Sequence, residues 1–189
     1  SKDTLFLDGS NKEEILEDIH LFINSKEDYN KYGVPYKRNY MLEGKPGTGK
    51  TSLITNVASE LNMDISIITF GPKLDDVNFM SAISNLPEKS ILILEDMDVL
   101  FTERKKAEGN NSFVSFSCIL NTLDGISRKD GLITFMTTNY IENLDPALIR
   151  PGRIDYRLNF DYATQEQIEK MFEFILPTQM ANLQKFIKK

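Results

Sequence analysis

The 189-residue sequence contains only one cysteine and one histidine, so a disulfide framework within the chain and metal sites built from several cysteines or histidines are excluded. Cys118 has no second cysteine to pair with and lies in an apolar helical pattern, so we expect a buried thiol in a reducing intracellular compartment. His20 lies among polar neighbours in a predicted helix, with no second ligand near it in the sequence. We therefore expect an exposed side chain there and assign it no chemistry.

Long apolar runs and an excess of positive charge are missing as well. No apolar segment reaches the length that spans a bilayer, and the formal net charge is -6. This acidic balance argues against a broad nucleic-acid surface and favours protein or small-molecule partners, although a small basic groove is compatible with it. The first residues, Ser1 to Asp3, are neither a start methionine nor a signal peptide. We expect a piece of a longer protein, so that any anchor or targeting segment could lie outside the chain.

One segment matches a phosphate-binding loop at every fixed position. Residues 44–51, G-K-P-G-T-G-K-T, fit the pattern G-x-x-x-x-G-K-[ST], between an apolar strand pattern and an amphipathic helical pattern. Glycines let main-chain amides approach phosphate oxygens, Lys50 neutralises phosphate charge, and the Thr51 hydroxyl can ligate Mg²⁺. The sequence therefore predicts a nucleoside triphosphate site. Its loop residues are Pro46, Gly47, Thr48, Gly49, Lys50, Thr51 and Ser52.

Strand and helix patterns alternate along the chain, of which 41% is hydrophobic. A capping-box pattern from Ser10 and apolar residues at helical spacing predict one helix before the loop. Later patterns predict strands at 65–70, 90–94 and 132–136, helices at 74–86 and 112–123, and a mobile loop at 104–111. This alternation indicates an α/β fold with a doubly wound parallel sheet, in which ligands bind beyond the carboxyl ends of the strands. We expect one core over residues 1–163 and the start of a helical appendage over residues 164–189.

An acidic strand end follows the phosphate loop in the sequence. The apolar strand pattern at 91–94 runs into Glu95 and Asp96, as in a Walker B segment, where one carboxylate holds Mg²⁺ and its neighbour polarises the attacking water. Asn139 closes the next buried strand pattern. Because parallel strands end at the same edge, it could hydrogen-bond the γ-phosphate or that water. These residues predict hydrolysis as well as binding.

Two arginines lie three residues apart in a loop, Arg150 and Arg153, with a proline and a glycine between them. Rigid, permanently charged guanidinium groups suit the phosphoryl oxygens of a transition state, where such an arginine contributes roughly 10³ to 10⁵ in rate. Surface arginines in local ion pairs are the alternative interpretation.

In this order the segments resemble an AAA-type ATPase, from about Leu5 to the end of the chain, and more narrowly the Bcs1-type family. The similar segments are Y-G-V-P-Y-K-R from Tyr32, L-E-D-M-D from Leu94, L-N-T-L-D-G-I from Leu120, and F-M-T-T-N from Phe135 on through Arg153. The Glu-Asp order at the Walker B site belongs to this similarity, since most of the wider class has Asp-Glu there.

The resemblance implies an AAA core of the P-loop NTPase class with a truncated C-terminal helical lid, using ATP and Mg²⁺. Glu95 matches the metal-side carboxylate and Asp96 the water-polarising one, but their inverted order leaves this division of labour open. Thr51 completes the implied metal ligands, and Asn139 matches the sensor-1 residue.

Further implied contacts involve the neighbouring subunit and the base. Arg150 and Arg153 match arginine fingers that act on the nucleotide of the next subunit in a homo-oligomeric ring. Tyr32 and Gly33 match the segment that lies beside adenine.

The resemblance also bears on what the ATPase works on. Ring unfoldases usually carry an aromatic-aliphatic-glycine trio after the second strand, whereas this chain has F-G-P-K from Phe70, so threading of an unfolded polypeptide is not supported. Bcs1-type proteins share this lack and move a folded protein across the mitochondrial inner membrane by using ATP. Their membrane anchor and middle domain would precede Ser1.

Three functions are therefore weighed. The favoured one is an ATPase module of a homo-oligomeric ring that remodels or translocates a protein substrate. The second is a nucleotide-dependent assembly switch with a vestigial ATPase, which the swapped acidic pair Glu95-Asp96 keeps open. The third is a nucleic-acid motor, which the acidic charge and the lack of an aromatic-basic platform argue against.

Overall fold

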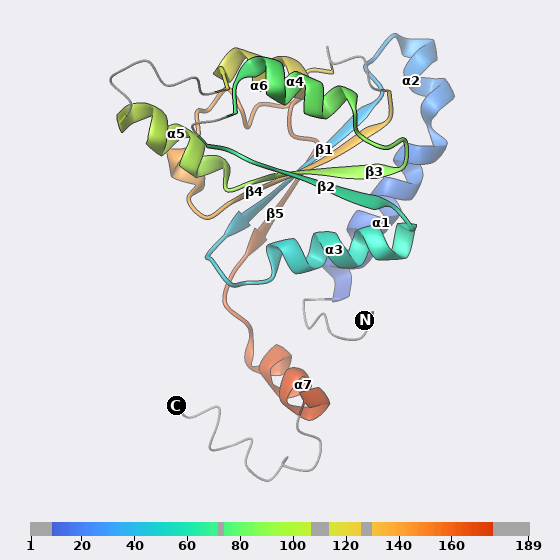
Figure 1. Cartoon of the computed structure of the whole chain (residues 1–189). Helices are drawn as coiled ribbons and strands as arrows, with labels where there is room; N and C mark the ends of the chain where they lie inside the picture. Colours follow the sequence, from blue (N-terminus) through green and yellow to red (C-terminus); the bar gives the residue numbers. More distant parts are fainter. Residues whose placement is uncertain (1–8, 72–73, 107–113, 126–129, 176–189) are drawn as a thin grey trace.

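The computed structural model describes residues 9–71, 74–106, 114–125 and 130–175. Five strands form one parallel sheet in the order β2-β3-β4-β1-β5, with helices on both sides (Figure 1). The strands are β1 Lys37–Gly44, β2 Asp64–Thr69, β3 Ser90–Glu95, β4 Leu132–Thr138 and β5 Tyr156–Phe160. The helices are α1 Gly9–Asn24, α2 Lys26–Tyr32, α3 Lys50–Leu61, α4 Asp76–Ser84, α5 Met97–Lys106, α6 Phe116–Leu123, the short 3₁₀ helix η2 Ile141–Asn143, and α7 Gln165–Ile175. The predicted α/β fold is confirmed.

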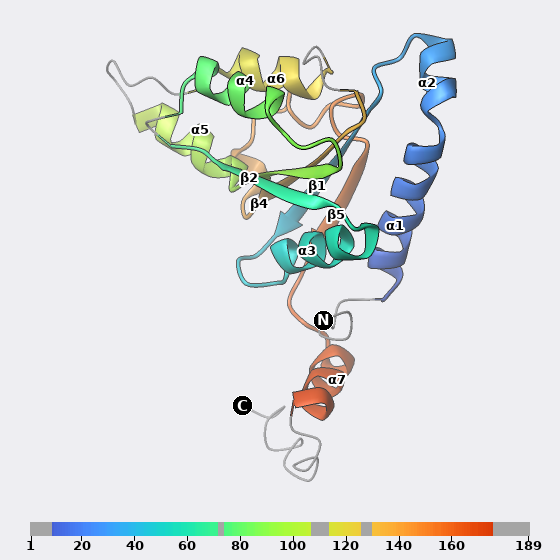
Figure 2. The same ribbon diagram turned by 45° about the vertical axis from the view of Figure 1, so that its right-hand side comes forward.

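The central strands bury both faces, because successive side chains of a strand point to opposite sides of the sheet. Tyr40 and Leu42 of β1 enter a core shared with α1 and α3, whereas Met41 enters a second core shared with α4, α5 and α6. In Figure 2, α3 lies on one side of the sheet and α4 and α6 on the other. All seven residues of β4 are buried, as expected for a central parallel strand.

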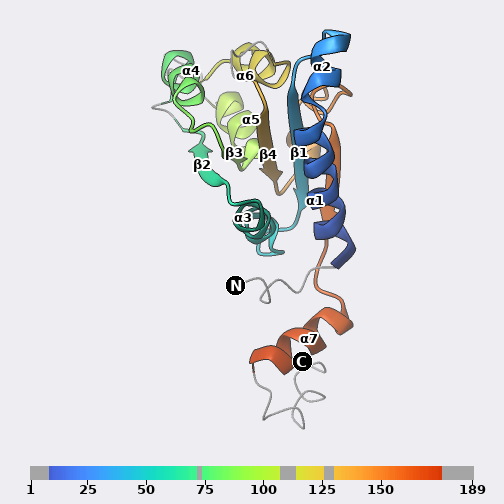
Figure 3. The ribbon, with the colours of Figure 1, turned by 90° about the vertical axis from the view of Figure 1, so that its right-hand side faces the viewer.

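The direction of β1 defines two edges of the sheet, one where the parallel strands start and one where they end. It starts beside α2 and ends at the phosphate loop and the start of α3, as Figures 1 and 3 show. The ends of β3 and β4 reach the same carboxyl edge, since both pair with their neighbours in parallel. Beyond β5 the chain leaves the sheet, and α7 stands apart from the layers in all three ribbon views.

Two helices, rather than the single one expected, precede β1. The chain breaks at Ser25, whose hydroxyl donates to the carbonyl of Leu21 at 2.6 Å, and α2 follows. None of the residues of α2 is buried, so it lacks the apolar stripe by which a helix is recognised in a sequence. The capping-box interpretation of Ser10 is wrong, because α1 already includes that residue.

Other boundaries also differ from the expected ones. Residues 104–106 belong to α5 rather than to the expected mobile loop. The rest of that expected loop, residues 107–111, lies outside the described residues. α6 starts later than expected, after Ser115, whose side chain accepts a hydrogen bond from the Cys118 amide. The edge strand β5 was missed, because its five residues bury only Leu158 and Phe160.

The two rare residues are placed nearly as expected. His20 is exposed on α1. Cys118 is only partly buried, against the core beneath α6, and burial together with nearby Asp76 raises the pKa of its thiol. Among the described residues, no helix is long and apolar enough to cross a membrane.

Candidate active site

The phosphate loop follows directly from β1, and its glycines have conformations that other residues rarely adopt. Gly44 has a φ of 131°, and a Cβ atom there would lie 1.9 Å from the carbonyl oxygen of Phe160 on β5. Gly49 has a φ of 97° and forms the N-terminal cap of α3. A side chain at Gly44 would collide with β5, and one at Gly49 would strain the start of the helix. The loop therefore needs glycine at these positions for local reasons.

Lys50, the first residue of α3, directs its ammonium group back over the loop. The Nζ atom donates to the carbonyl oxygens of Gly44 at 2.6 Å and Lys45 at 2.8 Å, and to Oδ1 of Asn139 at 2.9 Å. Burial lowers the pKa of this ammonium, while Asp96 and Asp98 act in the opposite direction. The structure thus holds a positive charge where the pattern predicts contact with phosphates.

The acidic pair at the end of β3 divides between two partners. Oε1 of Glu95 accepts a hydrogen bond from the Thr51 hydroxyl at 3.2 Å, so Glu95 faces the start of α3. Asp96 has a φ of 51°, its amide donates to Oγ1 of Thr137 at 3.1 Å, and its carboxylate accepts from Nδ2 of Asn139 at 3.2 Å. The left-handed backbone at Asp96 therefore turns the two neighbouring carboxylates toward different groups.

Hard-cation ligands are grouped on one side of this edge. Mg²⁺ is usually held by a few protein oxygens, with water and phosphate completing the shell. The hydroxyl of Thr51 and the carboxylate of Glu95 are such oxygens and touch each other. In the described part of the chain, no three histidine, cysteine or acidic residues are grouped so that they alone could hold a metal ion.

The remaining loop residues lie at the same edge. Thr48 is tied to the loop by a hydrogen bond from its hydroxyl to the carbonyl of Lys45 at 2.7 Å. Pro46 is exposed within the loop and Ser52 is exposed in the first turn of α3. The structure therefore brings together the loop, the acidic pair and Asn139.

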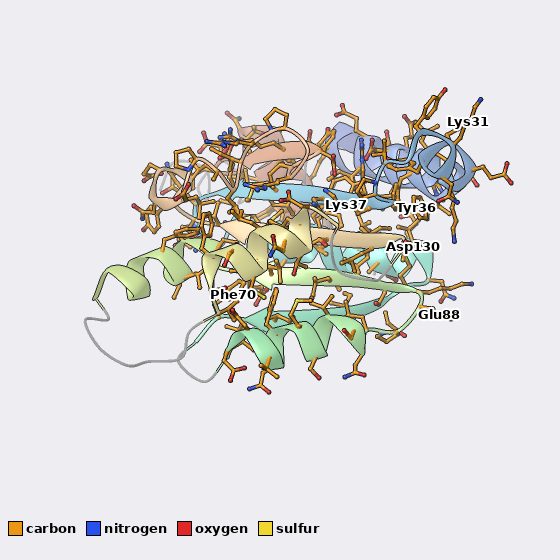
Figure 4. All side chains as sticks on the ribbon, turned by 90° about the horizontal axis from the view of Figure 1, so that it is seen from above. Lys31, Tyr36, Lys37, Phe70, Glu88 and Asp130 are labelled. Carbon is orange, nitrogen blue, oxygen red and sulfur yellow. The ribbon has the colours of Figure 1, made fainter. Side chains whose placement is uncertain are left out.

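The two arginines lie at the opposite edge of their own sheet. The backbone carbonyl of Arg153 accepts a hydrogen bond from the side-chain amide of Asn39, which is in the first half of β1. Gly44 lies five residues farther along that strand, roughly 17 Å away at about 3.3 Å per residue. Figure 4 is seen from above the view of Figure 1, from the side of α4 and α6, and labels Tyr36 and Lys37, which lie where β1 starts. Arg153 therefore does not reach the phosphate loop of its own chain.

A family model matches most of the chain. Residues 40–162 match the model of the "ATPase family associated with various cellular activities (AAA)". The chain belongs to the AAA family of ATPases. The match begins in β1 and ends just after β5, so it includes the phosphate loop, the acidic pair, Asn139 and both arginines.

Within the AAA family the similarity is to Bcs1-type proteins. The "Probable mitochondrial chaperone bcs1" of Schizosaccharomyces pombe is 41% identical over 172 residues, covering 89% of this chain and 38% of that protein. "Probable mitochondrial chaperone BCS1-A" of Dictyostelium discoideum is 42% identical over 177 residues, covering 88% and 42%. The human "Mitochondrial chaperone BCS1" is 38% identical over 176 residues, covering 89% and 42%. The chain thus spans about two fifths of the length of these relatives.

The expected adenine contacts are not brought to this AAA site. Tyr32 ends α2 and is 72% exposed, and Gly33 caps that helix with a φ of 63°. Both precede β1, so they lie at the edge where the strand starts, away from the loop that follows its end. We leave these two residues out of the nucleotide site proposed below, because the length of β1 separates them from the phosphate loop.

One residue that the sequence analysis left without a role supports the site from behind. Asp98, in the first turn of α5, is only 6% exposed. Its Oδ1 atom accepts hydrogen bonds from the Thr138 hydroxyl at 2.8 Å and from the Asn139 amide at 3.0 Å. Asp98 thus fixes the main chain that carries Asn139. In the sequence, Asp98 is marked only as a third carboxylate beside the Walker B pair. That it contacts Thr138 and Asn139 becomes clear only from the fold.

Proposed function

We propose that the chain binds ATP with Mg²⁺ and hydrolyses it as a module of a homo-oligomeric AAA ring. The observation that carries the proposal is the pair of contacts at the carboxyl edge: Lys50 with Asn139, and Thr51 with Glu95. Together they place a cation, an amide and metal-binding oxygens around the mouth of the phosphate loop. This is the set of groups that phosphoryl transfer to water needs, since its catalysis depends on positioning and charge neutralisation.

The contacts also support a division of labour between the two acids. Glu95 touches Thr51, so we assign it to the metal side, where bound Mg²⁺ would neutralise phosphate charge. Asp96 touches Asn139, so we assign it to the attacking water, from which it accepts a proton or a hydrogen bond. Asn139 then holds the water or the γ-phosphate in line, while Lys50 balances the charge that develops on the phosphoryl oxygens.

A neighbouring subunit supplies the remaining cation in this proposal. The arginine loop is fastened near the start of β1, roughly 17 Å along the strand from the phosphate loop of the same chain. A guanidinium acts on phosphoryl oxygens only in contact with them. The exposed Arg150 therefore acts on the nucleotide of the next subunit, and an isolated subunit has an incomplete site.

We further propose chaperone work on a protein substrate that is folded, with mitochondria as the compartment. The support is the Bcs1-type similarity, since the printed names of those relatives are mitochondrial chaperones. Phe70, the aromatic residue before the loop that follows β2, is 8% exposed and packs near Phe79, with ring centroids 6.2 Å apart. A buried core ring cannot grip a threaded polypeptide, which favours a folded substrate over an extended one.

Steady-state phosphate release, measured against protein concentration with and without Mg²⁺, tests this proposal. Turnover per subunit that rises with concentration and requires Mg²⁺ supports a ring ATPase whose sites are shared between subunits. Saturable ATP binding and assembly without sustained release would instead support the nucleotide-dependent switch. That second candidate is favoured only by the inverted order of Glu95 and Asp96, with Asp96 in a left-handed conformation.

A further inference from the structure

Each of the three guanidinium nitrogens of Arg153 donates a hydrogen bond within its own chain. Its Nε and Nη2 atoms donate to the two carboxylate oxygens of Asp124 at 2.8 and 2.9 Å, and Nη1 donates to the carbonyl of Ala147 at 2.7 Å. The Arg153 side chain is 21% exposed and that of Asp124 is 33% exposed. This ion pair lowers the pKa of the Asp124 carboxyl and raises that of Arg153.

Arg150 has a different environment in the same loop. Its side chain is exposed, and no hydrogen bond or ion pair to its guanidinium is found within the described part of the chain. Arg150 lies in the sequence between Ala147 and Arg153. The hydrogen bond from the Arg153 guanidinium to the Ala147 carbonyl joins these two residues across the segment that carries Arg150. One arginine of the pair is therefore free to meet a partner, and the other is committed.

The main chain around Arg153 is fastened to two further elements. The Asn39 side-chain amide, which is 1% exposed, donates to the carbonyls of Arg153 at 2.8 Å and Leu123 at 3.0 Å. The ammonium of Lys37 donates to the carbonyl of Gly152 at 2.7 Å. These bonds join the arginine loop to the start of β1 and to the end of α6.

The end of α6 is itself tightly packed at this point. Gly125, directly after Asp124, has a φ of 81°, and a Cβ atom there would lie 2.6 Å from Cβ of Pro35. The main chain directly after Asp124 therefore lies close against Pro35, and the Asp124 amide donates to the carbonyl of Leu120 at 2.8 Å. The main chain that carries this carboxylate is thus held at the end of α6.

We infer that Arg153 is a positioning residue that fastens the arginine loop to Asp124, so that Arg150 alone reaches the neighbouring nucleotide. Drawing Arg153 into a second subunit would break three hydrogen bonds and leave a half-buried carboxylate without its cation. Keeping it in place holds both ends of the short loop that carries Arg150. The inference rests on the proposed function, because it divides the two arginines of the proposed shared site.

The substitution Asp124→Asn separates this role from that of a second finger. If Arg153 is a positioning residue, Asp124→Asn and Arg153→Gln each lower kcat on the order of tenfold or more, because the loop loses its anchor. The double variant is then no slower than either single variant, since both changes remove one interaction. If Arg153 acts on the nucleotide directly, Asp124→Asn releases it and turnover stays at the parent rate or rises, which overturns the inference.

Binding of an ATP analogue and thermal unfolding are measured in the same variants. Should Asp124→Asn fail to fold, Asp124→Glu carries the test, because it keeps the charge but moves the carboxylate by about one methylene away from its place beside Arg153. A lowered kcat then supports the inference, and the parent kcat overturns it. The matched control is Asp18→Asn, whose carboxylate pairs with Arg38 at side-chain exposures of 21% and 24% on another face. It should lower the unfolding temperature without changing kcat below that temperature.

Arg150→Ala shows whether the proposed function itself fails. Its turnover should fall by roughly 10³-fold or more while ATP binding is kept. If Arg150→Ala instead hydrolyses ATP at the parent rate, the shared site is wrong, and the inference about Arg153 fails with it. If Arg150→Ala is inactive and Asp124→Asn keeps full activity, only the inference about Arg153 fails.

Discussion

Asn139 accepts a hydrogen bond from Lys50 at 2.9 Å and donates one to Asp96 at 3.2 Å. The Asn139 amide, at the end of β4, thus connects Lys50, which follows β1, with Asp96, which follows β3; β4 lies between these two strands in the sheet. An amide suits this place, because it donates and accepts at the same time. The Asn139 side chain therefore contacts both charged groups. Its position is fixed by the hydrogen bond from the Asn139 main-chain amide to the Asp98 carboxylate.

Removing the ammonium of Lys50 should abolish tight ATP binding. A hydrogen bond to a charged group contributes about 1.5–3 kcal/mol, so Lys50→Ala, which loses two or more of them to phosphates, should weaken affinity at least roughly a hundredfold. Titration of a fluorescent ATP analogue measures this. The control is Lys12→Ala, which removes a surface ion pair with Glu60 and should bind normally. Unchanged affinity in Lys50→Ala would contradict the phosphate-loop assignment.

The two neighbouring acids should respond differently to loss of charge. Asp96→Asn should keep Mg²⁺-dependent binding and lose turnover by roughly 10²- to 10⁴-fold, the usual contribution of a general base. Glu95→Gln should shift the Mg²⁺ concentration needed for analogue binding upward, because it removes a metal-side charge. Mg²⁺ titrations of both variants check this. The opposite pattern would exchange the roles that their contacts with Thr51 and Asn139 suggest.

Asp98→Ala should lower both turnover and stability while leaving nucleotide affinity nearly unchanged. The substitution leaves the Thr138 hydroxyl and the Asn139 amide without an acceptor, at about 1–3 kcal/mol for a buried unsatisfied group. Asn139 would then lose its fixed position, and kcat should fall roughly tenfold. Single-turnover kinetics and chemical denaturation measure the two effects. Glu88→Ala, which removes an exposed carboxylate, should change neither; a variant at Asp98 with normal kcat would remove its positioning role.

A methyl group at Gly44 should destabilise the fold before it affects chemistry. The added Cβ would lie 1.9 Å from the Phe160 carbonyl oxygen at a φ of 131°. Strain and overpacking together should lower the free energy of unfolding by about 3 kcal/mol or more. Gly71→Ala is the matched control, because no atom lies within 4 Å of its added Cβ. Equal stability of the two variants in denaturant titrations would mean that β5 does not press on the loop.

The sequence predicted the elements that physical patterns mark strongly. β3 and β4 are apolar runs buried on both faces, and the phosphate loop has fixed residues at fixed spacing, so each was recognised. α2 has no buried residue and β5 buries two, so neither has a periodicity that distinguishes it from a loop. Local patterns carry no information about elements held mainly by their position in the sheet.

Three-dimensional placement explains what the sequence left open at the site. The family resemblance implies adenine contacts for Tyr32 and Gly33, but both precede β1, and that strand carries the chain to the opposite edge. Arg150 and Arg153 have the same chemistry in the sequence. What distinguishes them is the bonding of Arg153 to Asp124, 29 residues before it in the chain, and to the carbonyl of Ala147. The edge at which a residue lies and the side chains that it contacts both depend on how the strands assemble into the sheet.

The structure of this chain with a non-hydrolysable ATP analogue and Mg²⁺, at a concentration where it assembles, tests the central claim most directly. The account predicts the phosphates at Lys50, the metal at Thr51 and Glu95, the γ-phosphate or its water facing Asp96 and Asn139, and Arg150 entering from a second copy. Nucleotide bound away from the loop would contradict the account. So would a complete site in which no second copy contributes a guanidinium.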